Sequence, residues 1–354
     1  MEAIEFVLGV LVVLVMLVDV FQTVVLPRPI IGSRIGIARA LVYLTWRAWR
    51  RFCNSIPSPN VRERRLGLYA PATLIMLLAL WIALLIVGYG LVLYAMRDQV
   101  DPVLRNLWEA FYLAGTSLLT IGFGDIVAKS AAARTVAVIA GGTGLVIVAL
   151  AITFVFSLYA FFQRRELLVT TLDGRAGAPP SGVALLETHG RLGMVDDLAR
   201  IFAAWELWSA EVLDSHLAYP LLGFFRSSHD NESWVSALGA LLDAATLCMT
   251  TVEDVPVGPA TMMRGVGAHL VEDVTAYFSM THEHGAGVER SEFDEARARL
   301  TAAGFRLREP EASWSQFSTL RGEYAGDLNA MASFWSVPPA QWIGDRSTLR
   351  HTEG

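Results

Sequence analysis

The residues whose types and spacing point most directly to chemistry form the segment Thr120-Ile121-Gly122-Phe123-Gly124-Asp125. Glycine at every second position allows backbone conformations that other residues rarely adopt. When several copies of such a segment surround one axis, their backbone carbonyls can replace the water molecules around a cation. The threonine hydroxyl can add a further ring of oxygen atoms at one end. The pattern therefore favours cation coordination by backbone oxygen.

Other residues that often do chemistry in proteins form no comparable pattern. All seven histidines lie in the second half of the chain. The run His282-Glu283-His284 suggests a metal site, but it lacks helical i, i+4 spacing and cysteine partners, so surface or hydrogen-bonded histidines are the favoured interpretation. His189, His216 and His229 are candidates for a pH response. Because the sequence contains no nucleophile–base set and no phosphate-binding loop, we expect no enzymatic activity.

Composition divides the chain into two parts. Hydrophobic residues make up 54% of the 354 residues, above the roughly 45–50% of soluble proteins. Residues 1–165 carry 15 Arg and Lys against 8 Asp and Glu, a net charge of +7, whereas residues 166–354 carry 13 against 26, a net charge of −13. We therefore expect a membrane part followed by a water-soluble part. Cys53 and Cys248 lie far apart, so no disulfide framework is predicted.

Three apolar stretches are long enough to cross a bilayer, which takes about 20 helical residues. They are Ile4–Leu26, Leu68–Met96 and Thr135–Gln163, and the last two contain no charged residue. Nine arginines lie between the first and second stretches, opposed by one glutamate. The positive-inside rule then predicts that residues 28–66 and the C-terminal part face the cytoplasm, with the N-terminus outside the plasma (inner) membrane. The first stretch lacks the repeated arginines of a voltage sensor.

Residues 97–134 are too long for a simple link and too short for another span. The apolar run Leu107–Leu119 predicts a short helix that enters the membrane, after which the chain returns as irregular backbone. Such backbone is tolerated in a membrane only where protein or water covers it. This helix and the motif at 120–125, between two charge-free spans, resemble the pore-loop potassium channels, whose signature is T-x-G-[YF]-G-D. The resemblance covers roughly residues 68–163.

The resemblance implies a homotetramer with one central pore, K+ as the permeant ion, and no organic cofactor or other metal. The K+-coordinating residues of the selectivity filter would be Thr120, Ile121, Gly122, Phe123 and Gly124. The outer mouth and the support of the filter would involve Asp125, Trp108, Tyr112 and Thr116. Phe123 replaces the commoner tyrosine of the family, which removes a hydroxyl that would tie the filter to the pore helix.

The third span contains two candidate gating elements. Gly141, Gly142 and Gly144 lie within four positions, although each helical glycine costs about 1 kcal/mol relative to alanine. They indicate either a gating hinge or close packing of helices through small residues, and both interpretations stay open. Phe154 and Leu158 are candidates for an inner gate that closes by dewetting. Contact of these side chains with lipid is the alternative.

Two features precede the second span. Asp19 is costly inside a membrane unless it is paired, and we expect it to pair with an arginine of the 28–66 loop, a structural role favoured over proton sensing. Residues 34–53 combine apolar positions with five arginines. This pattern predicts an amphipathic helix on the inner leaflet, with its basic residues towards anionic lipid headgroups.

The part after residue 165 shows helical periodicity and little strand alternation, which predicts an all-α bundle. No strand precedes a G-x-G-x-x-G motif, so the dinucleotide-binding domain attached to many bacterial potassium channels is not expected. We found no cyclic-nucleotide or calcium-loop signature either. The run 216–228 is dense in polar and aromatic residues. It is a candidate for a ligand or subunit-contact surface, with an ordinary connection between helices as the alternative.

These observations predict an all-α integral membrane protein with three transmembrane helices, a re-entrant pore helix and a cytoplasmic α-helical domain. The expected domains are an N-terminal transmembrane helix (1–27), an interfacial segment (28–66), a pore domain (67–165) and a regulatory domain (166–354). The favoured function is that of a K+ channel subunit with an unknown gating stimulus and no nucleic-acid partner. The alternative is a membrane receptor with a vestigial pore and a ligand-binding helical domain.

Overall fold

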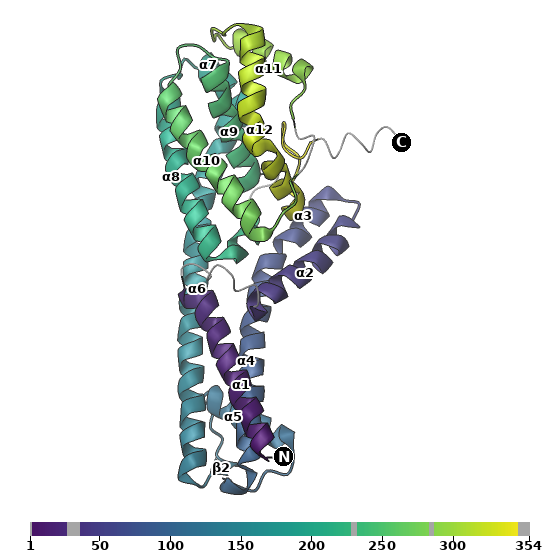
Figure 1. Ribbon diagram of the computed structural model, residues 1–354, viewed down its shortest axis with the longest axis vertical. Helices are drawn as coiled ribbons and strands as arrows, with labels where there is room; N and C mark the ends of the chain where they lie inside the picture. Colours follow the sequence, from purple (N-terminus) through teal and green to yellow (C-terminus); the bar gives the residue numbers. More distant parts are fainter. Residues whose placement is uncertain (1, 27–35, 228–231, 283–286, 346–354) are drawn as a thin grey trace. The chain divides into compact units, whose positions relative to one another are not determined.

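A computed structural model describes residues 2–26, 36–227, 232–282 and 287–345 (Figure 1). Nearly all regular structure in these ranges is helical, and the strands described there are the short antiparallel pair β1 (Val100–Asp101) and β2 (Val127–Ala128). The described helices long and apolar enough to cross a membrane are Glu2–Val25, Pro59–Ala95 and Ala131–Ala176. The prediction of an all-α membrane protein is confirmed. The chain forms two compact units, residues 1–159 and 160–354, and the predicted domain limits stay predictions.

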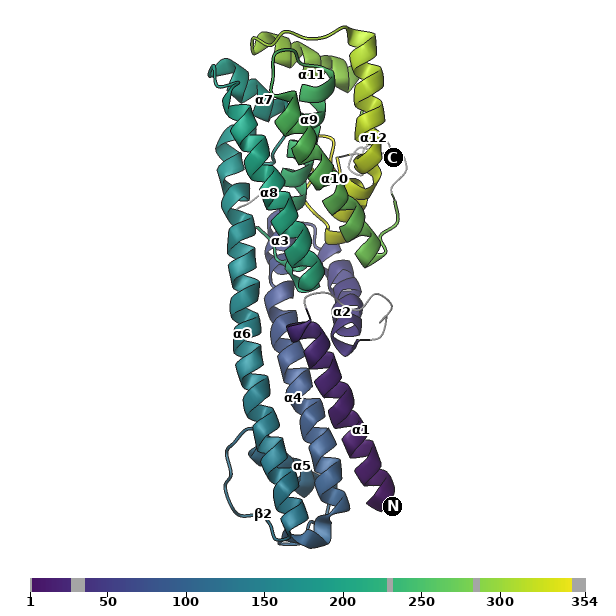
Figure 2. The ribbon, with the colours of Figure 1, turned by 60° about the vertical axis from the view of Figure 1, so that its left-hand side comes forward.

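The first unit is built around two long helices that pack closely. Its helices are α1 (Glu2–Val20), the π-helix η1 (Phe21–Val25), α2 (Ile37–Asn54), α3 (Pro59–Gly67), α4 (Tyr69–Ala95), the 3-10 turn η2 (Arg97–Gln99), α5 (Leu107–Leu118) and the first part of α6 (Ala131–Ala176). In Figure 2, α1 lies alongside α4. A Cβ at Gly9 would lie 2.6 Å from the Gly88 carbonyl oxygen, so small residues let the two backbones approach.

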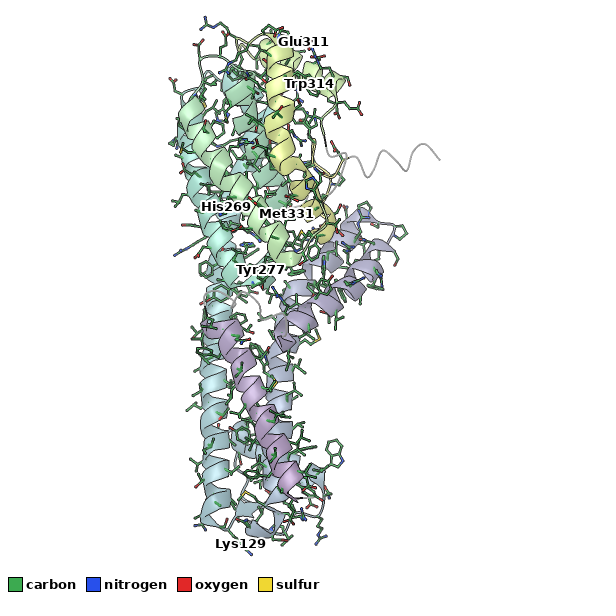
Figure 3. The ribbon with its side chains drawn as sticks, in the orientation of Figure 1. Lys129, His269, Tyr277, Glu311, Trp314 and Met331 are labelled. Atoms are coloured by element: carbon green, nitrogen blue, oxygen red, sulfur yellow. The ribbon has the colours of Figure 1, made fainter. Side chains whose placement is uncertain are left out.

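Helix α5 is held against α4 and against the ends of the flanking loops. A Cβ at Gly90 of α4 would overlap the Phe111 ring of α5. Ala110, Leu113 and Ala114 of α5 belong to the apolar core that α1, α4 and α6 share. The strand pair joins the chain before α5 to the chain after residue 126. Lys129, beside β2 in Figure 3, forms an ion pair with Asp101 at 3.1 Å. These contacts fix both ends of the segment that follows α5.

The second unit is a helical bundle. Besides the last part of α6 it contains α7 (Gly182–Arg191), α8 (Asp197–Ala218), the 3-10 turn η3 (Pro220–Phe224), α9 (Trp234–Thr250), α10 (Val257–Phe278), α11 (Arg290–Ala302) and α12 (Pro310–Trp335). The one charged residue of helix α9 is Asp243, which accepts hydrogen bonds from the Arg321 Nε–H and the Tyr324 hydroxyl, both at 2.8 Å. Burial raises the pKa of Asp243, and the charge of Arg321 opposes this shift. The hydrogen bonds from Arg321 and Tyr324 offset the cost of burying the Asp243 carboxyl.

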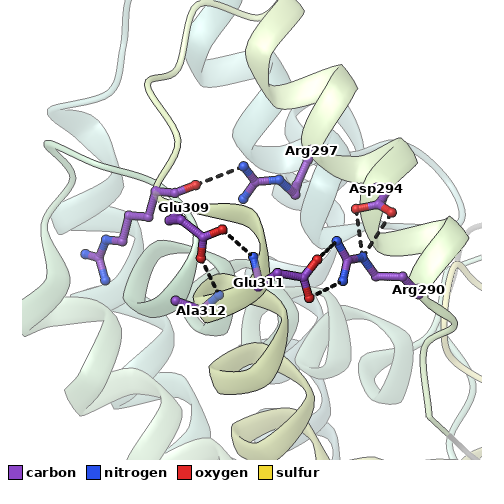
Figure 4. A network of polar contacts seen from close by, with 7 residues as sticks. Arg290, Asp294, Arg297, Glu309, Glu311 and Ala312 are labelled. Carbon is purple, nitrogen blue, oxygen red and sulfur yellow. Dashed lines mark hydrogen bonds and ion pairs between the residues drawn. The ribbon is translucent and has the colours of Figure 1, made fainter.

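A polar network joins α11 to the start of α12 (Figure 4). Arg290 donates two hydrogen bonds to Glu311 at 2.9 and 2.7 Å, and its Nε–H also donates to Asp294. Glu309 accepts hydrogen bonds from the backbone N–H groups of Glu311 and Ala312, at 3.1 and 2.7 Å, and these bonds lower the pKa of its carboxyl. The first N–H groups of a helix have no hydrogen-bond partner within the helix, and the Glu309 carboxylate accepts hydrogen bonds from two of them. Glu309 therefore sets where α12 begins.

Candidate ion-conducting segment

The start of α5 is closed by its own side chains. The Asn106 side-chain oxygen accepts a hydrogen bond from the Glu109 backbone N–H at 3.1 Å. The Glu109 carboxylate accepts from the Arg105 backbone N–H at 2.7 Å and from the Asn106 amide at 3.1 Å. A negative charge is also favoured at this end of the helix dipole. The contacts of Glu109 are therefore structural, since they fix the start of the pore helix.

Hydrogen bonds to the last turn of α5 hold the backbone that follows this helix. The Thr116 carbonyl accepts hydrogen bonds from the N–H groups of Ile121 at 2.8 Å and Gly122 at 3.2 Å. In a trans peptide the carbonyl points opposite to the N–H of the same plane. The carbonyls of Thr120 and Ile121 share planes with these two N–H groups, so both point away from α5. In a β-strand, successive carbonyls would instead point to opposite sides.

The sign of φ alternates along the segment. Thr120, Gly122 and Gly124 have φ of 56°, 59° and 82°, whereas Ile121 and Phe123 do not have positive φ. A Cβ at Gly122 or Gly124 would meet no atom within 4 Å of the single chain, so the backbone conformation, rather than space, requires glycine. For the β-branched Thr120 a positive φ is a strained conformation, with a cost of about 1–3 kcal/mol. Such strain is concentrated at functional sites.

Tyr112 connects α5 to the far end of the segment. Its hydroxyl donates to the two carboxylate oxygens of Asp125, at 3.1 and 3.0 Å. Its ring stacks on Phe123 with 6.3 Å between centroids and an interplanar angle of 1°. Phe123 itself has no hydroxyl, but the Tyr112 hydroxyl of α5 holds the Asp125 carboxylate two residues further on. Among the predicted supporting residues, Tyr112 and Thr116 contact the segment.

Trp108 lies elsewhere on α5. It packs edge-to-face on Phe111 with 5.8 Å between centroids and is highly exposed. In the part of the chain that the structure describes it makes no hydrogen bond to Asp125, and its predicted supporting role stays a prediction. All residues from 119 to 125 are exposed in the single chain, including the large apolar side chain of Phe123 at 69%. The segment is therefore accessible along its whole length in the single chain.

The three glycines of α6 have different surroundings. A Cβ at Gly144 would overlap the Leu118 carbonyl oxygen at the end of α5, and one at Gly141 would lie 3.3 Å from the Ser117 carbonyl oxygen. A Cβ at Gly142 would meet nothing within 4 Å. The packing alternative thus has direct support at Gly144 and Gly141. The gating hinge stays a prediction. Gly142 is the glycine of the three whose small size no neighbouring atom of the described chain requires.

The candidate inner gate lies on a covered face of α6. Phe154 and Leu158 are both buried in the single chain. Phe156 is 71% exposed, and Leu145 and Ile152, which lie within about 40° of it around the helix, are also exposed. The exposed face of α6 therefore carries Phe156, whereas Phe154 and Leu158 lie on a covered face. Whether Phe154 and Leu158 form a gate stays a prediction.

Asp19 is buried, with 5% exposure, and its described partners are N–H groups. Oδ1 accepts from the backbone N–H groups of Ile37 at 2.7 Å and Ala38 at 3.4 Å, and Oδ2 accepts from the Trp81 indole N–H at 2.9 Å. The expectation of an arginine partner is corrected for the described residues: the carboxylate caps the start of α2 and binds α4. Arg28 and Arg34 lie outside the described residues.

The second unit buries His189 and His216, two of the candidates for a pH response. Arg165 donates hydrogen bonds to His216 Nε2 at 3.1 Å and to the carbonyl oxygens of Leu222 and Phe225 at 2.9 and 2.7 Å. Burial, with the charge of Arg165, holds the pKa of His216 well below its usual 6.5. Within the run 216–225, His216 and residues 221–225 are buried, whereas residues 217–220 are partly exposed, so the candidate ligand or subunit-contact surface stays a prediction. Ser228 and His229 lie outside the described residues.

The suggested metal site has no described support. His282 Nδ1 is hydrogen-bonded to Asp327 at 2.9 Å, and Glu283 and His284 lie outside the described residues. In the described ranges no group of three or more His, Cys, Asp or Glu side chains is placed to hold a metal ion. Sequence reasoning missed the buried Arg165 and the Asp243–Arg321 pair. A lone acid inside the apolar helix α9 was the signal for the latter.

Two comparisons with known proteins give a match. Residues 77–160 match a family described as ion channel. An uncharacterized membrane protein of Bacillus subtilis (strain 168), YdjJ, is 23% identical over 216 residues, which cover 60% of this chain and 60% of that protein. No solved structure matches. The part of the chain that resembles ion channels includes all of α5, the exposed segment 119–125 and much of the two long helices α4 and α6.

Proposed function

We propose that four copies of this chain form one pore through which K+ crosses the membrane passively. The carrying observation is the backbone of Thr120 and Ile121, whose carbonyls point away from α5 because the next two N–H groups bind the Thr116 carbonyl. In this proposal the carbonyls of Gly122 and Phe123 continue the row, and the positive φ that recurs at Gly122 and Gly124 supports it. A row of carbonyls on one side of a strand is what replacement of the hydration shell of a cation requires.

Two physical arguments favour a homotetramer. One segment offers oxygen atoms from one side only, whereas a dehydrated cation needs them on all sides. The exposed irregular backbone at 119–125 also needs protein or water around it at the depth of a membrane. A fourfold ring meets both needs. In this arrangement Asp125, held by Tyr112 at 3.0 Å, adds negative charge at the outer mouth and attracts cations.

We propose that the second unit and the surrounding lipid regulate the opening of the pore. The protein lies in the plasma (inner) membrane, with the second unit in the cytoplasm, in agreement with the arginines before α4. Helix α1 contains no arginine, so membrane potential is not the proposed stimulus. Opening depends on a ligand or contact of the second unit, or on the surrounding lipid.

Ion flux from liposomes that contain the purified full chain tests the proposal. We expect K+ efflux that barium blocks and that Na+ does not replace. Gly122→Ala is the matched inactive variant, because open space around the Cβ leaves the fold intact while a left-handed alanine costs about 1–2 kcal/mol in each subunit. Equal passage of Na+ would overturn selectivity. Absence of flux under every lipid, voltage and pH would favour the receptor with a vestigial pore.

A further inference from the structure

Helix α2 exposes two adjacent ridges of different chemistry. The apolar ridge consists of Leu44, Ala48 and Phe52 at i, i+4 spacing. The basic ridge beside it consists of Tyr43, Arg47 and Arg51 at the same spacing. Leu44 and Phe52 are 67% and 56% exposed, although the opposite face of α2 is buried. An anionic lipid monolayer offers apolar acyl chains beneath negatively charged headgroups. The apolar ridge fits the acyl chains, and the basic ridge beside it fits the headgroups.

The surroundings of α2 favour lipid as the occupant. In the chain α2 lies between two helices long enough to cross a membrane. It is joined to the first turn of α4, because the Tyr69 hydroxyl donates to the Val42 carbonyl at 2.6 Å and the Tyr69 ring packs on Trp46. The ridges thus lie where a membrane-length helix begins. Arg64 and Arg65 of α3, also exposed, add positive charge just before that point.

Asp19 ties the start of α2 to both long helices. The first N–H groups of a helix have no partner within it, and the helix dipole favours a negative charge there. Asp19 of α1 supplies this charge to Ile37 and Ala38, and its other oxygen binds Trp81 of α4. Helix α4 in turn packs against α5, where Phe111 covers Gly90. A displacement of α2 therefore acts on the helix that holds the pore helix.

We infer that α2 binds anionic phospholipid through its two exposed ridges, and that Asp19 is the positioning residue that couples this binding to the pore domain. The lipid contact stands on the geometry of α2 alone. The coupling rests on the proposed function, because its effect is a change in ion flux. At a negative membrane surface each arginine contributes about fivefold in affinity.

The lipid contact is tested without ion flux. A fluorescent bimane label at Leu44→Cys is placed in the full chain in phosphatidylcholine vesicles, with equal fractions of brominated phosphatidylglycerol or brominated phosphatidylcholine. The wild-type chain is the blank, since Cys53 and Cys248 are buried and burial raises the pKa of the Cys248 thiol to about 12. We expect stronger quenching by the anionic lipid, a preference that falls about 25-fold in Arg47→Gln/Arg51→Gln.

A label at Leu192→Cys, exposed in the second unit, is the control and should show no preference. Equal quenching of the Leu44→Cys label by the two lipids would overturn the inference. So would relief of the quenching by soluble glycerol phosphate, which would identify a phosphate site rather than a membrane surface.

The coupling is tested by K+ flux as the phosphatidylglycerol fraction rises. We expect flux to increase in the wild type and this dependence to disappear in Asp19→Asn, while the quenching preference at position 44 is kept. Asp19→Glu should restore part of the dependence, which a merely destabilising role would not predict. A wild type whose flux ignores lipid charge would overturn the coupling. A wild type without any flux would overturn the proposed function and leave the quenching result standing.

Discussion

Two glycines of α6, two positions apart, provide a test of what the glycine cluster does. A Cβ at Gly144 would overlap the Leu118 carbonyl oxygen, whereas a Cβ at Gly142 would meet nothing within 4 Å. Alanine at position 142 should stabilise the helix by about 1 kcal/mol. At position 144 the same gain is opposed by overpacking, which costs about 1–3 kcal/mol, and a backbone carbonyl cannot rotate away as a side chain can. We expect Gly144→Ala to destabilise the chain.

The two variants should also differ in function. Leu118 is the last residue of α5, and the segment 119–125 starts from it. A displaced Leu118 moves the start of that segment, so Gly144→Ala should reduce K+ flux from liposomes. If Gly142 serves no hinge, Gly142→Ala should keep its flux and unfold at a higher temperature. If it serves as a hinge, flux should fall although stability rises.

Thermal unfolding of the full chain in detergent, followed by circular dichroism, gives the stability, and liposome flux gives the function. Gly141→Ala, whose Cβ would lie 3.3 Å from the Ser117 carbonyl oxygen, is the intermediate case. An unchanged melting temperature and flux in Gly144→Ala would refute the packing argument. Equal effects of alanine at 142 and 144 would refute the difference that the structure assigns to them.

Three further predictions concern other parts of the chain. Tyr112→Phe removes the two hydrogen bonds to Asp125 and keeps the ring on Phe123, so bi-ionic recordings should show lower K+ selectivity, and unchanged selectivity would argue against this anchor. If the exposed face of α6 lines the proposed pore, Phe156 is an apolar side chain that can narrow it, so Phe156→Ala should raise resting flux. Phe154 is buried, and Phe154→Ala should mainly lower stability, by about 3–5 kcal/mol; the reverse pattern would contradict a pore lined by the exposed face. Because the pKa of His216 lies well below 6.5 in the folded chain, the unfolded state takes up a proton first, and stability should fall below about pH 6.5 by up to about 1.4 kcal/mol per pH unit. Denaturant titrations of His216→Gln should show a shallower pH dependence, and an unaltered slope would contradict the burial of a neutral histidine.

The sequence identified the pore helix closely, because its polar start and apolar body are local signals. The predicted helix at 107–119 compares with an observed helix at Leu107–Leu118. The strained φ of Thr120 had no such signal, since threonine ordinarily avoids this conformation. The hydrogen bonds of Ile121 and Gly122 to Thr116 depend on how the chain leaves α5, which composition does not specify.

The partners and faces were harder to predict. An aspartate near nine arginines suggests an ion pair, yet Asp19 binds the N–H groups at the start of α2, a contact that depends on where that helix lies in space. Helix α6 is apolar all round in its membrane-length part, so periodicity cannot separate the covered Phe154 from the exposed Phe156. Helical periodicity was enough to predict the helical bundle of the second unit. Periodicity could not predict that Arg165 is buried.

We propose that residues 120–124 select K+ through their backbone carbonyls, and the decisive measurement for this proposal is the reversal potential of single channels. The purified full chain is placed in a planar bilayer with K+ on one side and Na+ on the other. We expect discrete openings whose current is carried by K+ and whose reversal potential follows the K+ gradient, and we expect these openings to be lost in Gly122→Ala. Openings that pass Na+ as readily as K+, or that persist unchanged in Gly122→Ala, would contradict this proposal.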